Sequence, residues 1–145
     1  MGMGHSYRCP HCGNGGALFI GVGMRNHEVS EKYKKAALNG EHGAEIQKIV
    51  KEHPEGRFDC AEVIYQCACG YWTVEEKGDY TVPKGEGERT GRPSVKEPTL
   101  IHEAEHLCPK CGKTMRACDE GTIPELACPE CGERLEITKD TILWD

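Results

Sequence analysis

The chain has 145 residues, a formal net charge of −6, a hydrophobic fraction of 37% and an aromatic fraction of 6%. So little apolar material argues against a large core, and small domains bury a modest share of their surface in any case, so something else must stabilise the fold. The acidic balance argues against a general nucleic-acid coat, because binding phosphates requires a surplus of Lys and Arg.

The N-terminal segment lacks the apolar core of a signal peptide, and no run approaches the roughly 18 apolar residues of a membrane span. We therefore expect a cytoplasmic protein with no membrane partner. Ten cysteines are available as disulfides or as metal ligands. In a reducing cytosol, cysteines spaced as Cys-x2-Cys hold metal far more often than they form disulfides.

Four short cysteine turns, which we call hooks, punctuate the chain. A Cys-x2-Cys turn brings two sulfurs to one side of a tetrahedral zinc ion about 2.3 Å away, and a second turn completes the four ligands. A Gly follows each hook and lets backbone N–H groups point at the sulfurs. The hooks lie, in chain order, at residues 9–12, 67–69, 108–111 and 128–131.

Between the first two hooks the pattern changes twice. Apolar residues at 17–23 predict a strand that leaves the first hook. Residues 29–38 predict a helix capped by Ser30, and residues 43–52 predict a second helix that ends before Pro54. Residues 58–74 then return to strand chemistry on both sides of the second hook.

The remaining segments are shorter. Residues 83–98 are polar and bounded by prolines, so they predict a linker or a mobile loop. Residues 99–106 predict a short helix. The apolar tail at 141–144 predicts that Trp144 plugs the core, with a partner-docking anchor as the alternative.

The two halves read as a diverged repeat of hook, strand, spacer, strand, hook and strand. The spacer holds fifty-four residues in the first copy and sixteen in the second, and the helical pair is the difference. We therefore predict a small metal-stabilised α+β fold of two zinc ribbons built from antiparallel β-hairpins. The expected organisation is a first ribbon at 1–82 with a helical insertion at 29–54, a linker at 83–99 and a C-terminal ribbon at 100–145.

At these hooks the sequence resembles the zinc-ribbon group, whose metal lies between two knuckles on β-hairpins. Residues 108–138 carry the resemblance best. The whole chain also resembles a bacterial family of short uncharacterised paired-ribbon proteins, on its first hook and its Ile-Leu-Trp-Asp ending. The resemblance implies two zinc ions, one bound by Cys9, Cys12, Cys67 and Cys69 and the other by Cys108, Cys111, Cys128 and Cys131. The shorter Cys67-Ala68-Cys69 spacing leaves the fourth ligand of the first site open.

Four thiolates fill a zinc shell and leave no position for water, so both sites are predicted to be structural. Cys60 and Cys118 each lie beside an aspartate, whose charge raises a thiol pKa, so we interpret them as packed cysteines rather than nucleophiles. A substitute-ligand role for either stays open. The sequence predicts a non-enzymatic zinc-binding interaction or accessory module with a protein partner. A nucleic-acid-binding ribbon is an alternative that the acidic charge disfavours.

One enzymatic alternative comes from His102, Glu103 and His106, which satisfy the His-Glu-x-x-His pattern of zinc hydrolases. That pattern works on a helix with a third ligand from another element, and here the segment runs almost directly into the third hook. A zinc-dependent hydrolase is therefore kept as a second hypothesis. Rubredoxin-like iron binding is a third, disfavoured by the sixteen-residue separation of the last two hooks and by the few aromatic residues.

Overall fold

The computed structural model describes residues 2–84, 97–118, 123–138 and 142–144. They form two compact units, each assembled from segments far apart in the sequence. The first unit contains Met1–Arg25, Ala61–Lys77 and Glu105–Asp145, and the second contains Asn26–Cys60 and Gly78–Ala104. These units differ from the expected consecutive ribbons at 1–82 and 100–145, because each unit takes residues from both sides of the expected linker. Residues 85–96 of that linker lie outside the described residues.

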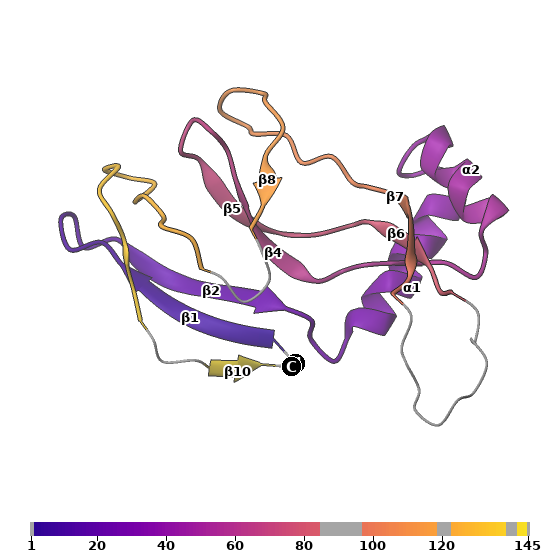
Figure 1. The fold of residues 1–145 in the computed structure, drawn as a ribbon, viewed down its shortest axis with the longest axis horizontal. Coiled ribbons are helices and arrows are strands. Elements are labelled where there is room, and N and C mark those ends of the chain that lie inside the picture. Colours follow the sequence, from indigo (N-terminus) through magenta and orange to yellow (C-terminus); the bar gives the residue numbers. More distant parts are fainter. Residues whose placement is uncertain (1, 85–96, 119–122, 139–141, 145) are drawn as a thin grey trace. The chain divides into compact units, whose positions relative to one another are not determined.

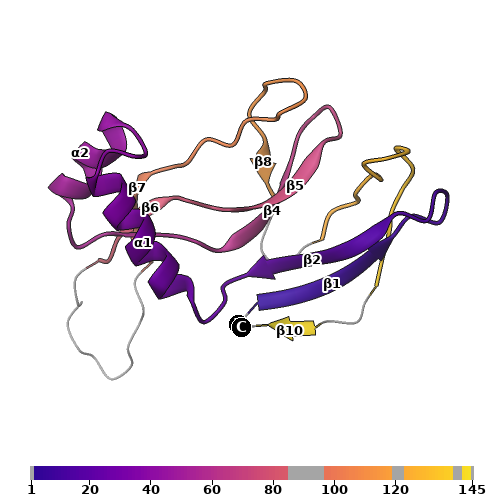
Figure 2. The same ribbon diagram turned by 180° about the vertical axis from the view of Figure 1, so that it is seen from behind.

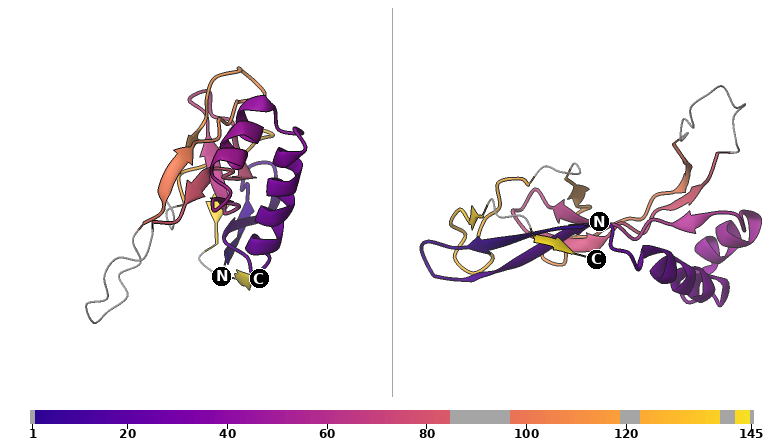
Figure 3. Two further views of the ribbon diagram at one scale, coloured as in Figure 1. Left: turned by 90° about the vertical axis from the view of Figure 1, so that its right-hand side faces the viewer. Right: turned by 90° about the horizontal axis from the view of Figure 1, so that it is seen from below.

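The first unit is built on one antiparallel sheet, which Figures 1 and 2 show from opposite sides. Its main path runs β10-β1-β2-β4-β5, while β9 pairs with β1 and β8 pairs with β4. β10 lies beside the beginning of β1, as Figure 3 also shows. The strands are β1 (Gly2–Arg8), β2 (Gly15–Gly21), β4 (Glu62–Gln66), β5 (Trp72–Glu76), β8 (Arg116–Ala117), β9 (Glu136–Ile137) and β10 (Ile142–Trp144).

Two hairpins give this sheet an internal repeat. β1 pairs with β2 in a long hairpin, and β4 pairs with β5 in a shorter one. β9 then adds to β1 with Tyr7 opposite Ile137, and β8 adds to β4 with Tyr65 opposite Ala117. We call the β1–β2 hairpin with residues 125–138 lobe A, and the β4–β5 hairpin with residues 105–118 lobe B.

Strand β4 is buried on both faces and supplies side chains to two apolar clusters. Successive side chains of a strand point to opposite faces, so Ile64 joins one cluster while Val63 and Tyr65 join the other. The indole Nε1 of Trp72 on β5 donates a hydrogen bond of 2.8 Å to the Ala127 carbonyl. The first cluster contains Cys9, Leu18, Ile20, Ile64, Leu126, Cys128 and Leu135, and the second contains Val63, Tyr65, Cys67, Cys108 and Met115.

The second unit contains both helices and a three-stranded sheet in the order β3-β6-β7. Its core is separate, with Ala37, Val50, Phe58, Cys60 and Tyr80 buried together. No helix among the described residues is long and apolar enough to cross a membrane. The elements are α1 (Asn26–Leu38), α2 (Ala44–Glu52), β3 (Arg57–Phe58), β6 (Tyr80–Val82) and β7 (Thr99–His102).

The two predicted helices are confirmed, but the first begins earlier than expected. Ser30 does not cap α1, which starts at Asn26. Instead Ser30 is buried inside the helix, where its hydroxyl accepts a hydrogen bond of 3.1 Å from the Phe58 amide. Gly40, with φ of 80°, ends the helix in the left-handed conformation that glycine favours.

The short helix predicted at 99–106 is wrong. Thr99–His102 forms strand β7, which pairs with β6 and places Leu100 opposite Thr81. The Ala104 amide then donates to the Asp79 carboxylate at 2.9 Å, so this segment finds its partners outside itself rather than in a helix. The side chain of Trp144 lies outside the described residues, and only the pairing of β10 with β1 is defined.

Candidate metal centres

Eight of the ten cysteines form two groups of four in the first unit. Within each group all Sγ atoms lie within 4.8 Å of one another. The first hook meets the fourth in lobe A, and the second meets the third in lobe B, so the predicted pairing of consecutive hooks is wrong. The lobe A group is Cys9, Cys12, Cys128 and Cys131, and the lobe B group is Cys67, Cys69, Cys108 and Cys111.

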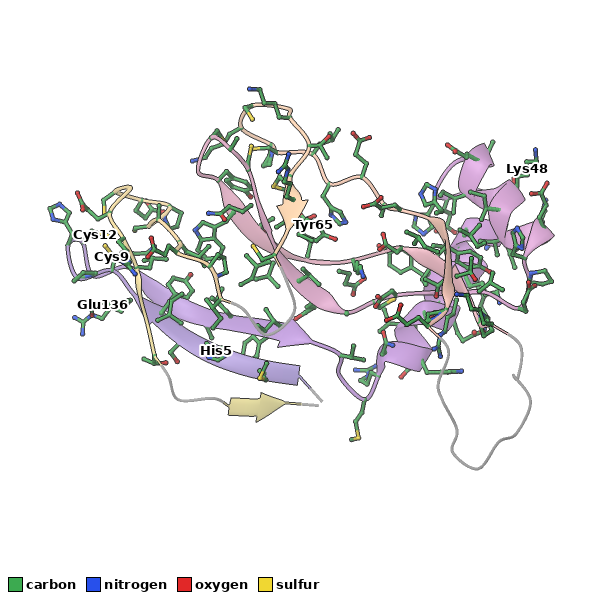
Figure 4. The ribbon with its side chains drawn as sticks, viewed as in Figure 1. His5, Cys9, Cys12, Lys48, Tyr65 and Glu136 are labelled. Carbon is green, nitrogen blue, oxygen red and sulfur yellow. The ribbon has the colours of Figure 1, made fainter. Side chains whose placement is uncertain are left out.

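Strand pairing explains why the hooks are nested rather than consecutive. Beyond the fourth hook, the Thr138 amide donates to the Ser6 carbonyl at 2.8 Å, which ties this segment to β1. Beyond the third hook, the Cys118 amide donates to the Ile64 carbonyl at 2.8 Å, which ties that segment to β4. Figure 4 shows Cys9 and Cys12 at the tip of the β1–β2 hairpin, next to the chain that leads into β9.

All four hooks share one backbone hydrogen-bonding pattern. In the first hook, the Cys9 amide donates to the Asn14 carbonyl and the Gly13 amide donates to the Cys9 carbonyl. The second hook makes the same two bonds although it is one residue shorter, through the Cys67 and Gly70 amides. The glycine that ends each hook has a φ between 75° and 95°, which residues with a side chain rarely adopt.

The sulfurs lie at ligand spacing rather than bonding distance. In lobe A, Cys9 Sγ lies 3.5 Å from Cys131 Sγ, and in lobe B, Cys69 Sγ lies 3.7 Å from Cys108 Sγ. A disulfide would bring two sulfurs to about 2.05 Å. A regular tetrahedron with metal–sulfur bonds of about 2.3 Å has edges of about 3.8 Å. Both groups could therefore hold a metal ion, and Cys69 completes the second one despite the shorter hook.

Each group contains at least one thiol whose pKa is lowered. Burial by itself raises the pKa of Cys128, but the amides of Cys131 and Glu130 point at its sulfur and lower the pKa to about 6. Burial likewise opposes ionisation of Cys108, whereas the amides of Cys111 and Lys110 outweigh it and lower the pKa to about 7. These hook amides therefore favour a thiolate at each site.

Another thiol of each group resists ionisation. The Glu133 amide favours the Cys131 thiolate, but burial and the three neighbouring cysteines outweigh it and raise the pKa to about 12. At Cys67 the Cys69 amide lowers the pKa, but burial and the neighbouring cysteines outweigh it and raise the pKa to about 12. Four thiolates cannot share so small a volume without a cation between them, so a divalent ion is the natural replacement for the remaining protons.

The residues of the hydrolase pattern are not arranged as a metal site. His102 ends strand β7 in the second unit, and His106 belongs to lobe B of the first. His106 Nδ1 lies 2.6 Å from Glu75 Oε2, its Nε2 lies 2.9 Å from the Lys77 carbonyl, and its ring stacks on Tyr65. Both ring nitrogens are thus used within lobe B, and the helix that the pattern needs is absent from residues 99–106.

Cys60 and Cys118 belong to neither group, and both are packed, as predicted. Cys60 is buried in the core of the second unit, where its thiol donates to the Phe58 carbonyl at 3.9 Å. Cys118 is half-buried and packs against the first apolar cluster, which contains Cys9 and Cys128.

Two side chains near the sulfurs were not predicted from the sequence to contribute to the sites. The Asn14 amide group lies 3.8 Å from Cys128 Sγ in lobe A. At the equivalent place in lobe B, Tyr71 has the Lys110 ammonium 5.7 Å from its ring centre. Each residue directly follows the glycine that ends a hairpin hook, and this position in the sequence could have identified both.

Comparison with family models, with curated proteins and with solved structures found no match to this chain. The two groups of four cysteines nonetheless fit a zinc-ribbon-like arrangement, with hooks that face one another across paired strands.

Proposed function

We propose that the protein is a non-enzymatic zinc-binding accessory module, in which the eight grouped cysteines hold two Zn²⁺ ions, one in each lobe. The observation that carries this proposal is the convergence of all eight sulfurs into two groups at tetrahedral spacing. Thiolate ligands select soft or borderline ions such as zinc or iron. The resemblance to zinc ribbons favours zinc.

Each ion would have a structural role. Four cysteines saturate tetrahedral zinc, whereas catalytic zinc keeps a position for water. The apolar clusters of the first unit are small and include four of the ligand cysteines, Cys9, Cys67, Cys108 and Cys128. Metal binding is therefore expected to supply a large part of the folding free energy, about 10 kcal/mol or more per site.

We place the module in the cytoplasm, where the thiols stay reduced and available to zinc. A protein partner is favoured over nucleic acid because the chain carries a net charge of −6.

Native mass spectrometry and absorption spectroscopy of the purified protein test this proposal. We expect a mass increment of two zinc ions and no visible absorption. A coloured iron protein, a single ion, or both ions bridged in one cluster would contradict it. As a matched pair of variants, Cys12→Ser and Cys69→Ser should each lose one ion, whereas Cys118→Ser should keep both.

A further inference from the structure

The third and fourth hooks are equivalent structures, twenty positions apart in the chain. The Met115 amide donates to the His106 carbonyl at 2.7 Å, and the Leu135 amide donates to the Leu126 carbonyl at 3.0 Å. The match extends to the surface of each lobe. Thr114 Oγ1 donates to Glu105 in lobe B, and Arg134 pairs with Glu125 in lobe A.

Charge is reversed at three equivalent positions of these two hooks. Lobe B carries only cations there, and residues 107–117 contain no Asp or Glu. Lobe A carries only carboxylates at the same three places. All six side chains are exposed, and the pairs are Lys110 with Glu130, Lys113 with Glu133, and Arg116 with Glu136.

Neighbouring charged groups do not remove the difference in charge between the third and fourth hooks. A zinc ion with four thiolates has a net charge of −2, but it would be common to both lobes and so leaves their difference unchanged. Arg8 lies opposite Glu136 across the β1–β9 pair and offsets part of that charge. The contrast therefore rests mainly on Lys110 and Lys113 against Glu130 and Glu133.

We propose that the third hook of one copy of this chain docks on the fourth hook of a second copy. When two surfaces of the same shape meet about a local two-fold axis, each of the three positions on one surface faces one of the same three positions on the other. Two identical hooks would bring like charges together, whereas the reversal at these positions makes every such contact attractive. The proposal rests on the proposed function, since it takes the metal-closed lobes as the interacting surfaces.

A second copy fits the cationic hook better than a polyanion does. The three cations of lobe B would also attract the phosphates of a polyanion, and the −2 charge of the adjacent metal centre would weaken either contact. The complementary carboxylates, in contrast, are present on every copy in the matching arrangement. Two different patches on one chain can close a dimer or continue as a chain of copies.

Sedimentation velocity of the zinc-loaded full chain tests the proposal. The wild type should associate at about 50 mM NaCl and dissociate at about 500 mM, because salt screens exposed charges. An acidic variant, Lys110→Glu with Lys113→Glu, and a basic variant, Glu130→Lys with Glu133→Lys, should each associate at least about tenfold more weakly. An equimolar mixture of the two variants should restore association, since the third and fourth hooks are both mainly acidic in one variant and both mainly basic in the other.

The matched control is Lys48→Glu with Lys51→Glu on α2, which makes the same change in net charge as the acidic variant and should associate like the wild type. A wild type that stays monomeric at low salt, or a mixture that stays monomeric, would overturn the proposal. So would salt-sensitive binding of a fluorescent oligothymidylate by a monomeric wild type, lost in the acidic variant, which would assign lobe B to nucleic acid. Zinc content is measured on every sample, so failure of the metal assignment is distinguished from failure of the docking contact.

Discussion

Lobes A and B build the same cysteine geometry from side chains that mostly differ. Tyr7 and Tyr65 hold equivalent places on β1 and β4, and each hook makes the same backbone hydrogen bonds. Beyond those positions, lobe A has Leu126 where lobe B has His106, and the surface charges of the third and fourth hooks are opposite. The comparison indicates that the sulfurs, the hook glycines and the strand register define the site, while the remaining positions are available for other purposes.

The contrast between Leu126 and His106 shows how differently the lobes fill an equivalent position. Leu126 is 1% exposed and belongs to an apolar cluster. The His106 ring stacks 3.8 Å from Tyr65 and bonds through both nitrogens, to Glu75 and to the Lys77 carbonyl. Lobe B therefore uses a hydrogen-bonded polar group where lobe A uses apolar burial, and that group lies outside the sulfur cage.

The largest expected effect comes from double cysteine variants that test the nesting of the hooks. Cys9→Ser with Cys131→Ser should remove one zinc ion, because both residues belong to lobe A. Cys9→Ser with Cys67→Ser should remove both ions and cost each lobe about 10 kcal/mol of metal-derived stability. Native mass spectrometry counts the ions. If Cys9→Ser with Cys67→Ser lost a single ion, consecutive hooks would share a site, and lobes A and B would not each form a metal centre.

Acidification should release zinc from both lobes. The stabilisation that Cys128 gains as a thiolate is fully present above its ordinary pKa of 9.0 and is lost as the pH falls through about 6. For Cys108 the loss comes as the pH falls through about 7. Cys12→Ser leaves only the lobe B site intact and Cys69→Ser leaves only the lobe A site, so a colorimetric chelator can measure zinc release from each lobe separately. Zinc release that did not depend on pH would contradict the prediction.

A core substitution in the second unit should destabilise that unit while zinc stays bound in both lobes of the first. Tyr80 is fully buried and its hydroxyl donates to the His53 carbonyl at 2.6 Å. Tyr80→Ala is expected to cost about 3–5 kcal/mol of that unit's stability. Leu38→Ala, at a side chain that is 40% exposed, is the control and should cost far less. Thermal unfolding and zinc content are measured together, and loss of either ion in Tyr80→Ala would show that the second unit supports a metal centre.

The smallest effect concerns a position where lobe B has a like-charge pair. Glu62 lies opposite Glu76 across β4 and β5, whereas lobe A has Gly4 opposite Phe19. Burial, and then the Glu76 charge, raise the pKa of Glu62. A carboxyl with a raised pKa stabilises the fold below its ordinary pKa and loses that contribution as pH rises.

Glu62→Gln should therefore raise stability at pH 7 by a few tenths of a kcal/mol, since the exposed part of the side chain screens the repulsion. The gain should vanish near pH 3, where both carboxyls are protonated. Denaturant unfolding at the two pH values measures it. A gain of equal size at both would attribute the effect to packing rather than charge.

Much of this architecture could be predicted because hooks and helices are local signals. The spacing of Cys108 and Cys111, the helix that ends before Pro54 and the strand that follows the first hook depend on residues close together in the chain. The number of cysteine groups also follows, because the four hooks supply eight thiols and each tetrahedral site takes four. These features needed no knowledge of how distant segments pair.

The pairing of hooks could not be predicted because it depends on strand register between remote segments. Either pairing places two hooks around each ion, and contacts such as the bonds from Thr138 to Ser6 and from Cys118 to Ile64 select the nested one. The role of Ser30 could not be predicted for a similar reason, since its hydrogen-bond partner Phe58 lies on another element. The charge reversal of the third and fourth hooks does not show in the net charge of −6, because opposite charges cancel in that sum.

The nesting of the hooks is tested most directly by cadmium-113 NMR. The ion replaces zinc in thiolate sites, and proton–cadmium correlation spectra connect each ion to the β-protons of the cysteines that bind it. Two cadmium signals are expected, one correlated with Cys9, Cys12, Cys128 and Cys131, the other with Cys67, Cys69, Cys108 and Cys111. Correlation of the third and fourth hooks with one ion would contradict the nested arrangement.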